Sequence, residues 1–250
     1  MNYDAEKQRF DRDGFVIVRQ FLTRDELTEL STQLERYIRE VVPGLSDAHA
    51  FYHDRARPET LKQMQFMQVD NFFRDYTEHP KWQALSATLV GESAQCESPE
   101  WFNKPAGLEH PTPPHQDNYY FNLKPPNVVT IWLALDKVDD ENGCLRYVAG
   151  SHQRGFRPHA RSNVLGFSQG ITDFGPADEA AEMKIHLSPG DAVAHHGMTI
   201  HRAELNRSSD RNRRAFAMVY KGISCRRDEA SFARYQEAAK KQHESMGLKT

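Results

Sequence analysis

The chain lacks several features that would place it in a specialised class. It has no apolar run approaching the roughly 18 residues that a membrane-spanning helix needs. Its first residues are charged and polar, unlike a signal peptide. It has no strong charge excess, because 32 Lys and Arg stand against 35 Asp and Glu, whereas a general nucleic-acid binder usually carries a large basic excess. We therefore expect neither a membrane protein nor a nucleic-acid-binding protein.

Cysteine is also scarce. The three cysteines, Cys96, Cys144 and Cys225, are an odd number at wide spacing. This pattern favours free thiols in a reducing compartment over a disulfide framework, so we expect a cytoplasmic protein. The 250 residues are enough for one domain with a sizeable core, and we expect 1–250 to form that single domain.

The N-terminal part, about residues 1–92, carries the clearest helical signals. Thr23 and Glu26 have the spacing of a capping box, and apolar residues then recur at helical spacing as far as Val41. A second helix is expected over 79–90, with a proline in its first turn. This part is therefore expected to be mainly helical, with one short strand at 14–19, where β-branched residues are frequent.

From about 93 to 222 the pattern changes to short apolar runs separated by turn signals. Residues 128–135 form a continuous apolar run, typical of a strand covered on both faces. We expect a mainly β fold with helical cladding, whose core is a double-stranded β-helix, a jelly roll of the cupin type. A charged helix at about 228–243 would close the chain.

Residues 152–182 stand out as a long insert with weak periodicity. Inserts of this length are usually functional or mobile. One hypothesis is a lid whose cationic residues, Arg154, Arg157, His159 and Arg161, meet an anionic substrate group, and the alternative is a solvated flexible loop. Two interpretations are also open for 119–121, whose aromatic side chains either pack under the barrel or form a wall of the substrate cavity.

The strongest local signal for chemistry is His115-Gln116-Asp117. In an extended segment, residues i and i+2 project from the same face, so His115 and Asp117 could hold one ion while Gln116 points elsewhere. One more histidine would complete the 2-His-1-carboxylate set of non-haem iron(II) oxygenases. The candidates for that histidine are His195, His196 and His201. An arginine on the following strand could clamp the distal carboxylate of a keto acid.

These segments resemble the phytanoyl-CoA dioxygenase family. The resemblance is carried by HQD, by VTIWLALDKVDDENGCLRYVAGSH, and by HHGMTIHRAELN with RRAFAMVY. It includes FDRDGFVIVRQFLTRDEL near the N-terminus and so spans most of residues 8–222. It implies an iron(II)- and 2-oxoglutarate-dependent dioxygenase that consumes O2 and releases succinate and CO2.

The resemblance also implies a metal site. His115, Asp117 and His201 would bind the iron, with His201 matching the distal histidine of the family. His195 and His196 are then expected to be hydrogen-bonded histidines of the core.

The resemblance further implies a 2-oxoglutarate site. Arg213 would anchor the distal carboxylate, although the length of the preceding turn leaves Arg211 as an alternative. Thr130 and Trp132 share one strand face and would line the pocket, together with Asn103.

The carboxylate at position 117 favours hydroxylation, because relatives that halogenate have a small residue there. The expected substrate is a small or medium-sized organic molecule, and the sequence selects neither the compound nor an oligomeric state. One alternative is a catalytically silent small-molecule-binding protein on the same fold. Another is a zinc-dependent hydrolase with the same ligands, which would have no need of an arginine for a keto acid.

Overall fold

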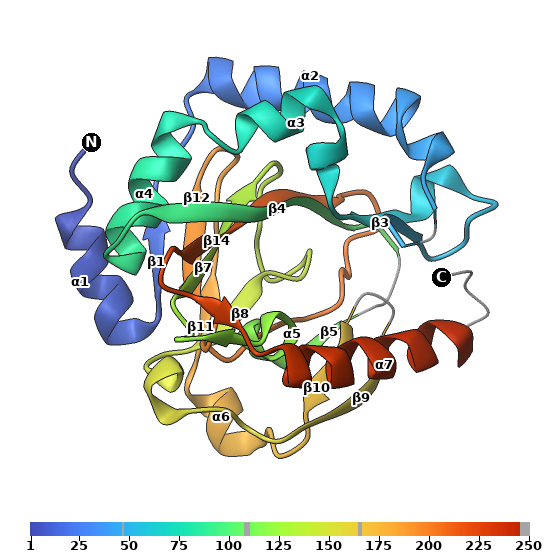
Figure 1. Ribbon diagram of the computed structural model, residues 1–250. Helices are drawn as coiled ribbons and strands as arrows, with labels where there is room; N and C mark the ends of the chain where they lie inside the picture. Colours follow the sequence, from blue (N-terminus) through green and yellow to red (C-terminus); the bar gives the residue numbers. More distant parts are fainter. Residues whose placement is uncertain (47, 108–110, 165–166, 246–250) are drawn as a thin grey trace.

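The fold, taken from a computed structural model, is built on two antiparallel sheets (Figure 1). The structure describes residues 1–46, 48–107, 111–164 and 167–245. The large sheet has the strand order β1 (Phe15–Val18), β12 (Ala192–His196), β7 (Val128–Ala134), β14 (Arg213–Gly222), β4 (Ala94–Lys104), β3 (Leu61–Met64) and β2 (Ala50–Tyr52). The small sheet has the order β11 (Glu182–Ile185), β8 (Leu145–Val148), β13 (His201–Ala203) and β5 (Thr112–His115). The expected jelly-roll core with helical cladding is confirmed.

Helices from the N-terminal part cover the outer face of the large sheet (Figure 1). They are α1 (Asp4–Asp13), α2 (Arg24–Glu40), α3 (Asn71–Tyr76) and α4 (Pro80–Val90). The predicted capping box begins α2, because the Glu26 amide donates to Thr23 Oγ1 and the Thr23 amide donates to the Glu26 carboxylate. Leu30 and Trp82, both fully buried, belong to the same core cluster as Phe216 of the sheet.

Alternation along β7 separates this outer core from the interior between the sheets. Every residue of β7 is buried. Ile131 and Leu133 belong to the cluster under the helices, whereas Trp132 and Ala134 belong to a second cluster between the sheets. The continuous apolar run is therefore explained by a strand covered on both faces.

The short strand expected over 14–19 is present as β1. The N-terminal part is still less purely helical than expected, because it also supplies β2 and β3 to the large sheet. These two strands are only three and four residues long, too short to establish a period-2 pattern by themselves. The predicted C-terminal helix is present as α7 (Glu229–Ser245). Its contacts are with α5 (Asn118–Phe121) and with β9 (His159–Val164) and β10 (Phe167–Ile171).

The insert at 152–182 has regular secondary structure where the structure describes it. β9 and β10 pair as an antiparallel hairpin, followed by the short helix α6 (Pro176–Ala180). Arg157 donates from Nε to Asp173 at 2.9 Å and from Nη1 to Asp178 at 3.1 Å. Its charge is therefore used to tie the insert together, which argues against a substrate contact by this residue.

Two further observations concern the cysteines and the helices of the described ranges. Cys96, Cys144 and Cys225 are all free thiols. No helix within those ranges is both long and apolar enough to cross a membrane.

Candidate metal and co-substrate site

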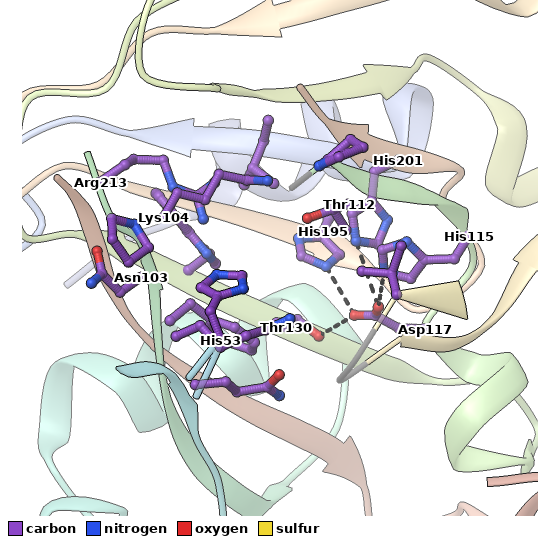
Figure 2. Close-up of a pocket in the computed structure, with 18 residues that line it drawn as sticks. His53, Asn103, Lys104, Thr112, His115, Asp117, Thr130, His195, His201 and Arg213 are labelled. Carbon is purple, nitrogen blue, oxygen red and sulfur yellow. Dashed lines mark hydrogen bonds and ion pairs between the residues drawn. The ribbon is translucent and has the colours of Figure 1, made fainter. Parts of the chain in front are cut away.

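A cavity between the two sheets gathers the residues that the sequence analysis singled out (Figure 2). The residues on its lining that were predicted from the sequence are Asn103, His115, Asp117, Thr130, Trp132, His201 and Arg213. Asn103, Thr130, Trp132 and Arg213 come from the large sheet, and His115 and His201 come from the small sheet. Residues far apart in the chain therefore meet in one place.

One end of the cavity holds a cluster of potential metal ligands. His115 on β5 and His201 on β13 are direct cross-strand partners, which explains why the two imidazoles meet. Asp117 Oδ1 lies 3.3 Å from His115 Nε2 and 3.5 Å from His201 Nε2. One ligand atom from each of the three residues lies within 4.8 Å of the others. Such an arrangement can hold a single divalent cation.

Asp117 reaches this point by a different route from the one expected. The segment is not extended through Asp117, because β5 ends at His115 and Asp117 has φ −57° and ψ −37° at the start of α5. A helical turn therefore brings the carboxylate close to the imidazole of His115. The alternation of side chains along a strand, on which the prediction was based, does not apply at Asp117.

Gln116 points away from the cluster, as predicted. Its Nε2 donates to the carbonyl of Met198 at 2.8 Å, and its Oε1 accepts from the amide of Arg157 at 2.9 Å. Gln116 therefore links the metal end of the cavity to the insert.

The orientation of both histidines leaves the required lone pairs free. His115 Nδ1 lies 2.8 Å from the carbonyl of Pro113, and His201 Nδ1 lies 3.0 Å from the carbonyl of Thr199. A carbonyl oxygen only accepts, so each Nδ1 must carry the proton. In its neutral form, each ring therefore presents an unprotonated Nε2 toward Asp117, as metal-binding histidines usually do.

The second oxygen of Asp117 is held by two other side chains. Asp117 Oδ2 accepts from Thr130 Oγ1 at 2.7 Å and from His195 Nε2 at 3.0 Å. His195 Nδ1 in turn accepts from the hydroxyl of Tyr147 at 2.8 Å. These contacts leave Oδ1 as the oxygen that faces the two Nε2 atoms.

The expectation that His195 is a buried, hydrogen-bonded histidine is confirmed, but its place beside Asp117 was missed. Thr130 and His195 are direct partners in the β7–β12 pairing, and this pairing could not be read from either segment alone. His196 lies on the other face of β12, with its ring 5.9 Å from that of Phe10, away from the cavity.

Charge at this end of the cavity is dominated by the buried carboxylate. Burial by itself raises the pKa of Asp117, but the surrounding histidines, His201 foremost, outweigh this effect and hold that pKa well below its ordinary value. Burial, together with His115 and His195, holds the pKa of His201 well below its ordinary value. One anionic oxygen and two neutral nitrogens form a donor set that suits iron(II).

The other end of the cavity carries a buried guanidinium. Arg213 is 4% exposed, donates to the carbonyl of Gly143 at 3.2 Å and lies over the Trp132 ring at 5.2 Å. Burial lowers its pKa to about 10, so it is still a cation at neutral pH. Among the residues that the structure describes, no carboxylate pairs with it. Arg211 is instead ion-paired with Asp139, so the cavity arginine is Arg213.

Two lysines on the cavity lining were missed by the sequence analysis. They are Lys62 on β3 and Lys104, which is the direct partner of Arg213 in the β4–β14 pairing. Burial lowers the pKa of Lys62 to about 8 and holds that of Lys104 well below its ordinary value. Asn103 lies beside them, its Nδ2 donating to the carbonyl of Leu61 at 3.1 Å. This end of the cavity is therefore suited to an anionic ligand.

A second group of possible metal ligands lies outside the cavity. It consists of Asp140, Cys144 and His186. Lys184 Nζ lies 3.2 Å from Asp140 and already neutralises its charge, and burial raises the pKa of the Cys144 thiol to about 11. This group is less suited to a divalent cation than the one in the cavity.

Comparison with known proteins identifies the family. The model of the phytanoyl-CoA dioxygenase (PhyH) family matches residues 10–215, so the chain belongs to this family. It is 26% identical over 236 residues to the peroxisomal phytanoyl-CoA dioxygenase of Rattus norvegicus, covering 88% of this chain and 69% of the relative. The match to the Mus musculus protein covers 64% of that relative, so the chain spans about two thirds of the length of these enzymes. The phytanoyl-CoA dioxygenase domain-containing protein 1 of Bos taurus is 26% identical, with coverage of 85% and 87%.

Solved structures show the same fold. The epimerase SnoN, in complex with Fe3+, alpha ketoglutarate and nogalamycin RO, has a TM-score of 0.75 at 22% identity and covers 93% of this chain and 88% of its own. The non-heme monooxygenase ThoJ has a TM-score of 0.71 at 21% identity, with coverage of 96% and 99%.

Family membership and the His-Asp-His group confirm the expected enzyme class, a 2-oxoglutarate-dependent non-haem iron dioxygenase that uses iron(II), 2-oxoglutarate and O2.

Proposed function

We propose that this enzyme hydroxylates a small or medium-sized organic molecule, with release of succinate and CO2. The observation that carries the proposal is the convergence of Asp117 Oδ1 with the Nε2 atoms of His115 and His201, in a cavity whose far end holds a guanidinium that pairs with no described carboxylate. When bound, iron(II) supplies the redox chemistry with O2 that protein side chains lack. The chain itself supplies position, charge and exclusion of water.

At the metal end, His115, Asp117 and His201 would hold the iron. Thr130 and His195 would act as positioning residues, because their hydrogen bonds to Asp117 Oδ2 keep Oδ1 turned toward the two imidazoles. Partners of this kind fix the geometry of metal ligands and raise metal affinity.

At the other end, Arg213 would bind the distal carboxylate of 2-oxoglutarate. A guanidinium can hold a carboxylate through two parallel hydrogen bonds, and the ring of Trp132 supports its plane at 5.2 Å. Lys62 and Lys104 would add positive charge around the same carboxylate, and Asn103 would complete the wall. A dianionic co-substrate would thereby bring negative charge to Arg213, with which no described carboxylate pairs.

Hydroxylation is favoured over halogenation because the carboxylate of Asp117 occupies the third protein position around the metal. A halogenating relative leaves that position to a halide, as the small residue in such enzymes indicates. The catalytically silent alternative has no use for a complete and oriented donor set.

The test is a metabolite screen with iron(II), ascorbate and 2-oxoglutarate under air, in which succinate is quantified and products are analysed by mass spectrometry. We expect slow succinate formation without substrate, faster formation with the true substrate, and a product heavier by one oxygen atom. A stimulated reaction whose product gains no oxygen would replace hydroxylation by another oxidative outcome. The binding of 2-oxoglutarate without any succinate formation would favour the silent protein.

A further inference from the structure

Glu100 lies on the inner face of β4, next to the cavity. Side chains at i and i+2 of a strand share a face, and Phe102 and Lys104, the next two residues on the face of Glu100, both line the cavity. Trp101, between Glu100 and Phe102, belongs instead to the core under the helices, whereas Ala217, the direct partner of Glu100, belongs to the cluster between the sheets. The side chain of Glu100 therefore points into the interior between the sheets. Glu100 is not itself on the lining of the co-substrate cavity.

Strand pairing places Glu100 on the same wall as Trp132. Glu100 is the direct partner of Ala217 on β14, and Ala217 is the direct partner of Trp132 on β7. Direct partners in antiparallel strands project from the same face. The residue between the acid and the indole on this wall is Ala217, whose side chain is only a methyl group.

The carboxyl group of Glu100 has no partner within the described part of the chain. No hydrogen bond or ion pair joins its side chain to another described residue, whereas Glu97 on the same strand is ion-paired with Lys221 and Arg227. Burial, and then the negative charge of Asp117, raise the pKa of Glu100 to about 8. The contribution of Asp117 indicates that the two carboxyl groups lie close enough to interact.

The positive charges of the cavity do not serve Glu100. Arg213 lies at the end that 2-oxoglutarate would occupy, and no described residue forms an ion pair with Glu100. A carboxylate turned toward the interior between the sheets is most favourable with a cation beside it. A cation that pairs with Glu100 would therefore come with a ligand.

Resting on the function proposed above, we propose that Glu100 is a specificity-determining residue that binds a positively charged nitrogen of the substrate, an alkylammonium or guanidinium group. The carboxylate would hold this group beside the metal and so fix which carbon atom faces the iron. A neutral hydroxyl group would gain only an ordinary hydrogen bond from the same residue, and an anionic group would be repelled.

The test uses the iron(II)–2-oxoglutarate enzyme under anaerobic conditions, where substrate binding perturbs the weak visible charge-transfer band. The probes are straight-chain aliphatic amines and the alcohols of the same chain length. We expect the amines to bind at least about tenfold more tightly than the matched alcohols, as a partly desolvated charge pair requires. Glu100→Gln keeps the shape and removes the charge, and it should abolish this preference. Glu100→Asp should retain the preference with lower affinity.

Glu97→Gln is the matched control, because it removes a carboxylate from the same strand at an outward, ion-paired position. It should leave the amine preference unchanged. Equal binding of amines and alcohols, a preference that survives in Glu100→Gln, or no response to any amine would each overturn the assignment. If the band forms and only the preference is missing, the Glu100 assignment fails while the proposed function stands. If the band does not form at all, both fail.

Discussion

Arg213 and Arg214 are neighbours on β14, and the fold uses the same charge in two different ways. Arg214 points outward and donates to Asp136, with Nη2 2.7 Å from Oδ1. Arg213 points inward, is buried, and donates to a backbone carbonyl with no described carboxylate beside it. An exposed ion pair contributes only ~0–1 kcal/mol to stability, whereas a buried cation without an anion is unfavourable. Inward charges that the fold leaves unpaired therefore mark places where a ligand supplies the partner.

The two carboxylates on β4 repeat this contrast with the opposite sign. Glu97 is ion-paired at the surface, and Glu100 is turned inward without a described partner. The outward carboxylate is neutralised by Lys221 and Arg227, whereas the inward acid is available to a ligand. The presence or absence of a described ion-pair partner therefore distinguishes the two carboxylates without any comparison with related proteins.

The largest effect is expected at the inward carboxylate of the metal group. Asp117→Ala removes the only anionic protein ligand of the proposed iron, so succinate formation should fall to the level of the iron-free enzyme. Asp136→Ala removes an outward carboxylate and should keep most of the activity. Succinate formation and bound iron are measured for both variants. Full activity in Asp117→Ala would contradict the claim that the inward carboxylate is functional and the outward one is not.

The next effect concerns the two neighbouring arginines. Arg213→Ala should raise the 2-oxoglutarate concentration for half-maximal turnover by about 100-fold or more, the scale for truncating one partner of a buried charge pair. Iron binding should be retained. Arg214→Ala and Arg211→Ala should change the 2-oxoglutarate requirement little, because their charges are used at the surface. If Arg211→Ala instead gave the large effect, Arg213 would not be the anchor.

A smaller effect is expected from a group that only positions a ligand. Thr130→Val keeps the volume of the side chain and removes the hydrogen bond to Asp117 Oδ2. Loss of such a contact lowers metal affinity by about 10-fold to 100-fold, and we expect the lower end because His195 still holds the same oxygen. Iron affinity is measured by anaerobic titration, with Thr32→Val on the exposed face of α2 as the control. Unchanged iron affinity in Thr130→Val would show that Thr130 lines the cavity without positioning Asp117.

The smallest effect on catalysis is expected in the insert. Arg157→Ala breaks ion pairs with Asp173 and Asp178 that are partly exposed, so it should lower the free energy of unfolding by about 1 kcal/mol. The Michaelis constants should not change. Denaturant unfolding and steady-state kinetics check this together. A raised Michaelis constant for the substrate with unchanged stability would restore the hypothesis of a cationic lid.

Much of the site was predictable because the relevant information is local. The HQD triplet puts two ligand types two residues apart, and the polar turn before β14 marks the start of the strand that carries Arg213. Binary patterning then gave the fold class, since β7 is apolar on both faces.

The rest depends on pairing between distant segments. His195 reaches Asp117 only because β12 lies beside β7, and Lys62 reaches the cavity from β3, a strand within a part that was expected to be helical. The helical backbone of Asp117 could not be predicted, because a carboxylate two residues after a histidine can approach the imidazole from either an extended or a helical segment. Glu100 could not be singled out from the sequence, because its inward position and the lack of a described ion-pair partner are visible only in the folded structure.

The most direct test of the account is an anaerobic titration of the purified protein with iron(II) in the presence of 2-oxoglutarate. The account predicts one iron per chain and a visible charge-transfer band that is lost in Asp117→Ala and needs far more 2-oxoglutarate in Arg213→Ala. Stoichiometric iron binding that persists unchanged in Asp117→Ala, or a band that responds to Arg214→Ala and not to Arg213→Ala, would contradict it.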